Sequence, residues 1–458
     1  MNRRWMKLGV AATILMLAAP AHAAADPALA KRVLLRSVAF KTVEGEGQVP
    51  KLADYYASVL KDAGFADADI TITPIGETAT LAATLKGSDP KLKPLLMIGH
   101  MDVVAADRRD WTRDPFVAVE ENGYIFGRGA EDNKYDVAMM VTTLAQLKRD
   151  GFKPRRTVIL LLSGDEETQM ATTRALAQKY KNAELLLNGD GGGGLIGEDG
   201  KPALFQLQAG EKTYADFEIA ITDAGGHSSA PTATNPIYRL AKVLDRIASY
   251  QFAPMANELT RASMRAGSRR IAGEAGAAMA RYAANPQDAE AAAVLSSKPE
   301  LVGQIRTTCV ATMLSGGHAL NALPQRATVS VNCRIFPGVS IESVKAELTK
   351  VIADDSATIT TLGEPLASDA SPLRKDVIAA VTKAVQARYP GLEVTPSMIS
   401  GATDSLYFRA SDVPSYGVSS LFQKASDGFA HGLNERVPVD GIPGALQQWD
   451  IMLKMLSK

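Results

Sequence analysis

Acidic residues and histidines in this chain collect where apolar, strand-like runs end. Three such runs lead into residues 99–102, 163–167 and 188–190, which supply His100, Asp102, Asp165, Glu166, Glu167 and Asp190. In an open α/β sheet, ligands bind beyond the carboxyl ends of the strands. Imidazole and carboxylate donors in this proportion suit zinc, and three protein ligands per ion leave room for water.

Two further segments extend the pattern. Residues 127–134, Gly-Arg-Gly-Ala-Glu-Asp-Asn-Lys, stand at the start of a predicted helix, and residues 431–435, His-Gly-Leu-Asn-Glu, lie near the C-terminus. A lone pair of glutamates is usually a solvated turn, and a lone His-x-Asp is more often structural. Five such segments in one domain are hard to explain as coincidence, so the sequence predicts a metal centre.

Together with Gly226-His227-Ser228, these segments resemble the aminoacylase and carboxypeptidase family of dinuclear zinc metallopeptidases, and its carboxypeptidase S-like members most of all. The resemblance covers essentially the whole mature chain. It implies hydrolysis of an amide bond in a small peptide or an N-acyl amino acid. Whether the substrate is that of a dipeptidase, a carboxypeptidase or an aminoacylase stays open.

The resemblance also implies the ligands of two divalent metal ions per chain, zinc in preference to cobalt or manganese. His100 and Asp190 would bind one ion, Glu167 and His431 the other, and Asp132 would bridge the two. A cis peptide after Asp132 is implied as well.

Two acidic residues next to these ligands have other expected roles. Side chains two apart on extended backbone point the same way, so Asp102 is expected to orient His100. Glu166 would be the general base that takes a proton from the metal-activated water and returns it to the leaving amine.

Other matching positions imply substrate contacts. His227 would donate to the oxyanion across the interface of a homodimer, although a lone histidine on a Gly-rich turn is more often structural. Asn321, Arg334 and Gly401 match positions that contact substrate, and the Arg334 guanidinium suits a substrate carboxylate.

The elements that must position these residues alternate between strands and helices from about residue 26 to 210, which is typical of a mostly parallel sheet covered by helices. From about residue 212, the order becomes strand, helix, two strands, helix, strand, as in a small split βαβ domain. After residue 363, the sequence again alternates between helical and strand-like segments, as it does before residue 210. The clearest predicted elements are strands 94–99, 157–162, 184–188, 214–222, 307–314, 326–336, 357–362 and 413–418, and helices 134–149, 236–250, 340–353 and 372–389.

With the resemblance, these patterns predict two domains. Residues 24–211 and 364–458 would form an α/β catalytic domain of the zinc-dependent exopeptidase type, and residues 212–363 an inserted α+β dimerisation or lid domain. The Ala-rich residues 265–297 are expected to add helices, broken at Pro286, as a surface elaboration rather than a substrate lid.

The first residues read as a targeting segment. Three basic residues, an apolar run over residues 8–20 and Ala21-His22-Ala23 form the pattern of a cleaved secretory signal, residues 1–23. We therefore expect an exported protein, periplasmic or secreted, without a stable membrane anchor. Cleavage would leave 47 basic and 50 acidic residues, which gives no argument for nucleic-acid binding.

Several features of the sequence allow alternative interpretations. Cys309 and Cys333 could form one disulfide as cross-strand partners or stay two buried thiols.

Residues 226–230 imitate a nucleophile elbow, which would make Ser228 the nucleophile of a serine hydrolase, but the flanking glycines and prolines do not fit its sharp strand-to-helix turn. A solute-binding module that kept the fold and lost catalysis is the non-enzymatic alternative. The glycines at 191–194 lack the spacing of a phosphate-binding loop and are expected to form a flexible loop.

Overall fold

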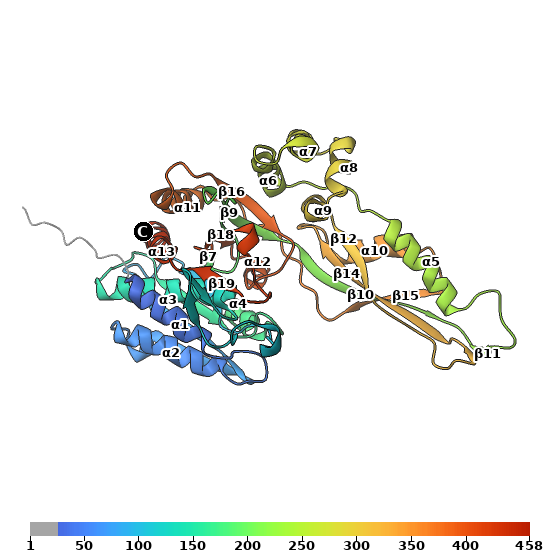
Figure 1. Ribbon diagram of the computed structural model, residues 1–458, viewed down its shortest axis with the longest axis horizontal. Coiled ribbons are helices and arrows are strands. Elements are labelled where there is room, and N and C mark those ends of the chain that lie inside the picture. The colour runs from blue at the N-terminus through green and yellow to red at the C-terminus, as the bar shows by residue number, and fades with distance from the viewer. Residues whose placement is uncertain (1–25) are drawn as a thin grey trace, which may run out of the picture.

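The computed structural model describes residues 26–458, so the predicted signal segment, residues 1–23, lies outside it. The chain forms two lobes, a large one that holds both the early and the late residues and a smaller one that extends from it (Figure 1). Among the described residues, no helix is both long and apolar enough to cross a membrane.

The large lobe is built on a ten-stranded sheet. The parallel core that the sequence predicts is present in neighbouring strands β6, β3, β7 and β17, and antiparallel strands extend it on both sides. The order is β1 (Ile70–Ile75), β2 (Thr78–Leu85), β6 (Val158–Ser163), β3 (Leu95–His100), β7 (Leu185–Asn188), β17 (Ser415–Gly417), β9 (Pro202–Glu211), β8 (Gly193–Ile196) and β18 (Phe422–Lys424), with β16 (Val394–Ile399) paired to β9.

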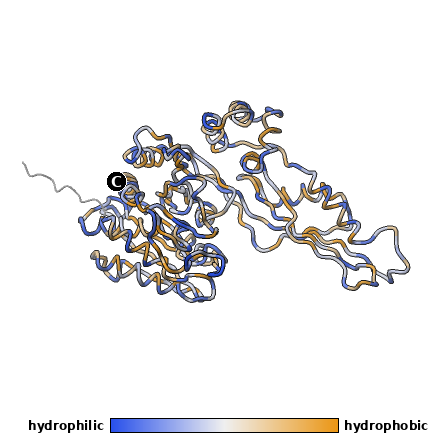
Figure 2. Tube along the Cα trace, viewed as in Figure 1, coloured by the Kyte–Doolittle hydropathy of each residue, from blue (hydrophilic) through white to orange (hydrophobic). Residues whose placement is uncertain are grey.

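Both faces of this sheet are covered at its centre, which explains why the inner strands β3 and β6 are almost entirely apolar and fully buried. In β3, Leu95 and Met97 join the main core, whereas Leu96 and Ile98 join a second core on the opposite face. Figure 2 shows apolar stretches along these inner strands. The main core is closed by α1 (Pro27–Val38), α2 (Val49–Asp62), α3 (Tyr135–Arg149), α11 (Lys375–Arg388) and α13 (Ile442–Leu456), and the second by α4 (Ala171–Tyr180) and α12 (Ser405–Arg409).

The small lobe contains an antiparallel four-stranded sheet. Its order is β12 (Thr308–Gly316), β14 (Arg326–Ile335), β10 (Thr213–Thr222) and β15 (Ala357–Leu362). Helices α5 (Pro236–Ser249) and α10 (Ile341–Ile352) share a core with alternate residues of the strands, such as Ala215 and Phe217. This is the predicted split βαβ arrangement. Cys309 and Cys333, directly opposite in β12 and β14, form a disulfide.

The predicted helical insertion is longer than residues 265–297. It consists of α6 (Glu258–Ser268), α7 (Gly273–Ala284), α8 (Ala289–Ser296) and α9 (Pro299–Ile305), and the break between α7 and α8 contains Pro286 as expected. These helices have a small core of their own, and α6 packs against β16 of the large sheet.

Short strands complete the fold. The segment that follows residues 431–435 pairs with two strands from the N-terminal half of the chain. Together they form a three-stranded sheet of β19 (Arg436–Pro438), β5 (Tyr124–Phe126) and β4 (Val119–Glu121). At the far tip of the small lobe, β11 (Gly226–His227) pairs with β13 (Ala322–Leu323) (Figure 1).

Candidate active site

The predicted metal ligands are brought together at one edge of the large sheet. Strands β6, β3 and β7 are parallel neighbours, and their carboxyl ends carry the segments that follow Ser163, His100 and Asn188. The edge therefore places Glu166 and Glu167 on one side of His100 and Asp190 on the other. Strand order brings these segments to one edge, and the short loops after the strands set the final positions of the side chains.

Asp132 lies between the two histidines of the cluster. Its Oδ1 is 2.8 Å from His100 Nε2, and its Oδ2 is 3.3 Å from His431 Nε2. His431 Nε2 is also 2.8 Å from Glu167 Oε1, and His100 Nε2 is 3.9 Å from Asp190 Oδ2. The peptide bond after Asp132 is cis, as the sequence resemblance implies. One carboxylate thus faces two separate groups of potential ligands.

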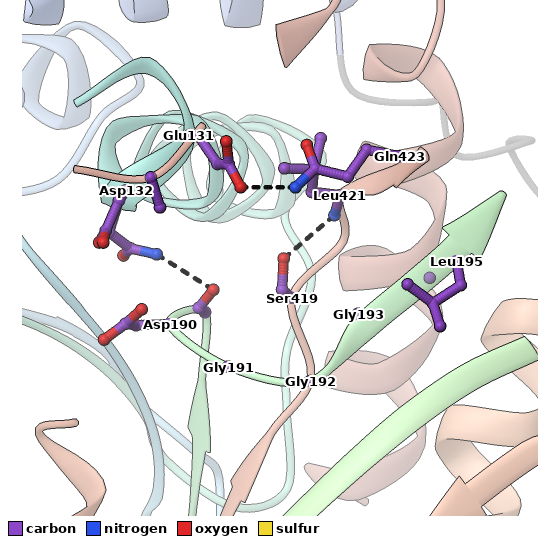
Figure 3. Close-up of a pocket in the computed structure, with 14 residues that line it drawn as sticks. Glu131, Asp132, Asp190, Gly191, Gly192, Gly193, Leu195, Ser419, Leu421 and Gln423 are labelled. Atoms are coloured by element: carbon purple, nitrogen blue, oxygen red, sulfur yellow. Dashed lines mark hydrogen bonds between the residues drawn. The ribbon is translucent and has the colours of Figure 1, made fainter. Parts of the chain in front are cut away.

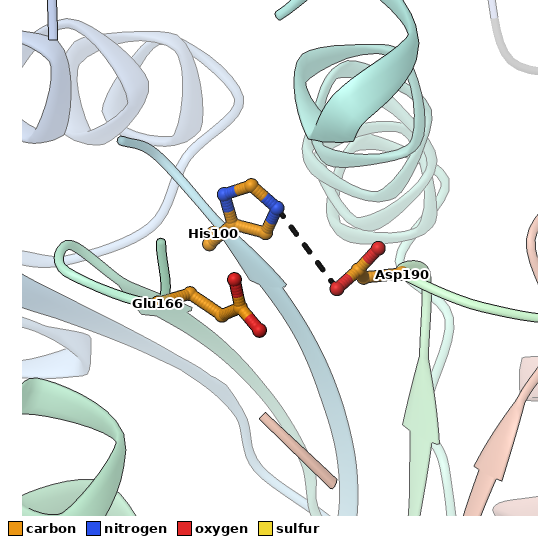
Figure 4. A group of neighbouring side chains, drawn as sticks. All are labelled: His100, Glu166 and Asp190. Carbon is orange, nitrogen blue, oxygen red and sulfur yellow. Dashed lines mark ion pairs between the residues drawn. The ribbon is translucent and has the colours of Figure 1, made fainter. Parts of the chain in front are cut away.

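Two triads of donor atoms are close enough to hold a cation. His100 with Asp132 and Glu167 forms one, and His100 with Glu166 and Asp190 forms the other, each with its atoms within 4.8 Å of one another. Figure 4 shows the carboxylates of Glu166 and Asp190 directed toward the same space beside the His100 ring.

Asp102 supports the segment that carries these glutamates. Its Oδ1 accepts the Glu166 backbone N–H at 3.1 Å, and its Oδ2 accepts the Glu167 N–H at 3.0 Å. His100 Nδ1 lies 3.0 Å from the backbone oxygen of Asp102 and 3.7 Å from its carboxylate. The ring is therefore oriented mainly by the main chain of Asp102, and the side chain orients the neighbouring loop.

The electrostatics of the cluster suit cations. Burial raises the pKa of Glu166 well above its usual range, and burial followed by the charge of Asp132 does the same to the pKa of Asp190. Burial opposes protonation of His100, but the nearby carboxylates of Asp102 and Asp132 raise its pKa well above the ordinary value. Hydrogen bonds to Asp132 and Glu167 raise the pKa of His431 to about 10. Buried acids that repel one another in this way are groups that a pair of divalent ions would stabilise as anions.

The 400–404 turn reaches this edge through buried side chains that the sequence did not reveal. Asp404 is fully buried, and its Oδ2 accepts a hydrogen bond from Ser163 Oγ at 2.8 Å. Thr403 donates to Glu211 Oε1 at 2.5 Å. Only the start of the turn is exposed, and there Arg334 Nη1 donates to the backbone oxygen of Ser400 at 3.3 Å. The structure therefore brings Arg334 together with the turn that contains Gly401.

His227 and Asn321 are placed elsewhere. Both lie at the tip of the small lobe, where the Ser228 N–H donates to the Asn321 oxygen at 3.0 Å and His227 Nδ1 lies 2.7 Å from Ser229 Oγ. They are remote from the metal-ligand cluster of their own chain (Figure 1). Ser228 lies in an exposed turn that follows β11 and does not lead directly into a helix, so the geometry of a nucleophile elbow is missing.

A pocket adjoins the cluster behind Asp132 and Asp190 (Figure 3). The glycines at 191–194, expected to form a flexible loop, line the floor of this pocket. Gly193 and Gly194 instead belong to strand β8, so only the first two glycines lie outside a strand. Gly192 has φ 71°, and a Cβ atom there would lie 2.4 Å from the Gly417 oxygen, so close backbone contact accounts for this glycine.

Comparison with known proteins agrees with this geometry. Residues 96–454 match the model of peptidase family M20/M25/M40. The N-fatty-acyl-amino acid synthase/hydrolase PM20D1 of Mus musculus is 27% identical over 369 residues, covering 78% of this chain and 73% of that protein. Carboxypeptidase S of Saccharomyces cerevisiae is 30% identical over 294 residues, covering 60% of this chain and 51% of that protein.

Solved structures share the fold. The M20 family metallo-carboxypeptidase Sso-CP2 from Sulfolobus solfataricus superimposes with a TM-score of 0.67 at 20% identity, covering 93% of this chain and 99% of that one. Human carnosine dipeptidase 1 gives 0.62 at 16% identity, covering 94% and 97%. The chain belongs to peptidase family M20/M25/M40 and is a metal-dependent hydrolase with a carboxypeptidase S-like sequence.

Proposed function

We propose that this chain hydrolyses the amide bond of an N-acyl amino acid or a small peptide, with Glu166 as the general base. The observation that carries the proposal is the position of Asp132, whose two oxygens face two different histidines. The names of the PM20D1 relatives favour an N-acyl amino acid as the first substrate class to test.

Five residues have the chemistry and the placement to hold two divalent ions. His100 and Asp190 would hold one ion, Glu167 and His431 the other, and Asp132 would be shared. When bound, such ions polarise the attacking water and the scissile carbonyl, and zinc is the ion we expect.

Glu166 is suited to carry the proton. Its carboxylate lies among the donors of the second triad, and its backbone is fixed by Asp102. In the proposed reaction it accepts a proton from the attacking water and delivers it to the nitrogen of the leaving amine. Burial raises the pKa of this carboxyl, which makes its carboxylate form a stronger base toward the attacking water.

Substrate orientation would come from Arg334 and the 400–404 turn. The guanidinium stands beside the turn, at the junction of the two lobes, and can bind a free carboxylate in a bidentate manner. Gly401 is exposed next to it and leaves room for the substrate backbone.

A homodimer would complete the site. Strand β12 is an edge strand, and Val310, Met313 and Leu314 on it are 60%, 71% and 66% exposed. Natural proteins seldom leave such an apolar edge unpaired, so we assign it to a two-fold contact between small lobes. The exposed tip with His227 and Asn321 would then serve the partner's active site, where His227 donates to the oxyanion.

Two further assignments belong to the proposal. We assign residues 24–211 and 364–458 to the catalytic domain and residues 212–363 to the dimerisation domain. We also propose export with cleavage after Ala23, which N-terminal sequencing of the secreted or periplasmic protein would test.

The decisive experiment combines a metal count with a substrate panel. The purified mature chain is assayed for amine release from N-acyl amino acids and dipeptides, beside Glu166→Gln and the control Glu290→Gln on α8, whose side chain is 87% exposed. We expect about two metals per chain in all three proteins and a loss of kcat in Glu166→Gln of about 1,000-fold.

Three results would contradict the proposal. A chain that binds no metal would refute the ligand assignment, and full activity of Glu166→Gln would refute the base. A metal-loaded chain that cleaves no member of the panel would favour the binding-module alternative.

A further inference from the structure

The small sheet has one covered face and one open face. Ala215 and Phe217 of β10 point into the core beneath α5 and α10, so Tyr214 and Asp216 point to the opposite side. Arg334 lies directly across from Tyr214 in β14, and Asn332 directly across from Asp216. These four side chains therefore form one array on the open face, where the sheet joins the large lobe (Figure 1).

The Arg334 guanidinium rests on an aromatic ring. Its Cζ atom is 4.7 Å from the centroid of the Tyr214 ring, and the Tyr214 residue is 44% exposed. Its Nη1 donates to the Ser400 oxygen at 3.3 Å. Within residues 26–458, Arg334 has no ion pair, so its charge is held in place without being neutralised.

The acid on this face is already engaged. Asp216 Oδ2 accepts a hydrogen bond from the Tyr214 hydroxyl at 2.5 Å, and its Oδ1 accepts one from Asn332 Nδ2 at 2.8 Å. Each oxygen of the Asp216 carboxylate therefore already accepts a hydrogen bond from a residue other than Arg334. Tyr214 is thus in contact with the guanidinium through its ring and with the competing acid through its hydroxyl.

We propose that Tyr214 is a positioning residue, which holds the Arg334 guanidinium beside the Ser400 turn for the free carboxylate of the leaving amino acid. The inference rests on the proposed function of Arg334 and deepens it. A guanidinium that lies over an aromatic ring contacts it with its face and leaves N–H donors at its edge free, which suits a bidentate carboxylate. The substrate class is therefore an amide whose leaving group carries a free α-carboxylate.

The test compares an N-acyl amino acid with its C-terminal amide. With the carboxylate substrate we expect Tyr214→Leu to raise KM about fivefold, the size of a stacked cation contact, and to leave kcat nearly unchanged. Tyr214→Phe keeps the ring and is expected within about twofold of wild type. With the amide, neither variant should change KM. Arg334→Ala, measured in parallel, should raise KM for the carboxylate about 50-fold.

The control is Tyr180→Leu, which removes a partly buried tyrosine at the C-terminal end of α4 whose ring centroid lies 5.3 Å from Lys179 Nζ. It should change neither KM nor metal content. If Arg334→Ala discriminates between the two substrates but Tyr214→Leu does not, the inference is wrong and the proposed role of Arg334 stands. Equal cleavage of both substrates by the wild type, unaffected by Arg334→Ala, would overturn both. If Tyr214→Phe raised KM for the carboxylate substrate as much as Tyr214→Leu does, the contact between the Tyr214 ring and Arg334 would not be the cause of the effect.

Discussion

Glu435 joins two distant parts of the chain behind the cluster around Asp132. Its Oε2 accepts from Arg128 Nη1 at 2.6 Å and from the Gly129 N–H at 2.9 Å, and its Oε1 accepts from the N–H groups of Glu131 and Asp132 at 2.8 and 3.0 Å. The carboxylate is fully buried. A residue about 300 positions away therefore fixes the backbone on which Asp132 is carried.

Replacing this carboxylate by an amide tests that role. Glu435→Gln keeps the shape but turns an N–H toward existing donors and leaves Arg128 without its buried partner. We expect the free energy of unfolding of the metal-free protein to fall by about 3 kcal/mol. Urea titration followed by tryptophan fluorescence measures the change, since Trp449 lies in the core of the same lobe.

The matched control is Glu218→Gln, which breaks the Arg326–Glu218 pair of the small sheet, with its arginine side chain 54% exposed. Its expected cost is below about 0.5 kcal/mol. Equal costs for the two variants would show that Glu435 contributes no more than a surface charge.

At the same residue scale, the sequence predicted the residues at strand ends and, of those that support them, only Asp102. His100, Asp190 and Glu167 could be found because strand ends converge in any parallel sheet. The contacts of Glu435, Asp404 and Tyr214 join residues from different elements, and no local pattern marks such pairs. Asp404 in particular stands in a turn that reads as exposed, although the side chain is fully buried.

At the scale of elements, periodicity located strands and helices to within a few residues, as for β15, predicted and found at residues 357–362. The predicted start of the helical insertion, residue 265, is too far along the chain. The prediction followed the alanine content of the segment and overlooked the residue that caps its first helix. The Asn257 side chain accepts from the Thr260 N–H and starts α6 at Glu258, seven residues before the predicted start. Asn257 itself was the signal that could have corrected the boundary.

Lys212 stands in the segment that connects β9 to β10 and gives this junction a pH dependence. Its Nζ donates to the Arg306 oxygen at 2.9 Å and to Thr308 Oγ1 at 3.2 Å. Burial, and then the charge of Arg334, lowers the pKa of Lys212 to about 7. Since the unfolded chain keeps its proton up to a pH of about 10.4, it binds more protons than the folded chain between these values. Stability from this group therefore rises with pH across that window.

Lys212→Met should remove this dependence. Relative to wild type, the variant is expected to gain most in free energy of unfolding below pH 7, where the buried ammonium is charged, and to lose that advantage toward pH 10. Urea titrations of both proteins at pH 6, 8 and 10 give the difference, in which all shared titrating groups cancel. A difference that is constant with pH would show that Lys212 has an ordinary pKa in the fold.

At the scale of the whole molecule, the two lobes place proposed parts of one active site far apart. The cluster around Asp132 lies on the large lobe, whereas His227 lies at the far tip of the small one (Figure 1). A closing motion within one chain would have to bring that tip back over the length of the small sheet. A two-fold contact along the exposed edge β12 needs no such motion, because each tip can approach the partner's large lobe. Sequence patterns could suggest the residues but not this separation, which depends on how far the sheet extends.

Complementation between two inactive chains tests this arrangement directly. His227→Ala and Glu166→Gln are co-expressed with different affinity tags, and the heterodimer is isolated by both tags in turn. In the heterodimer, one site combines an intact Glu166 with His227 of the partner subunit, and the other has neither. We expect each homodimer to be nearly inactive and the heterodimer to show about half the wild-type activity per dimer. An inactive heterodimer of normal metal content would place His227 in the site of its own chain, whereas an active His227→Ala homodimer would place it outside any site. Failure of the two chains to co-purify would remove the dimer itself, and the apolar edge of β12 would then require another partner.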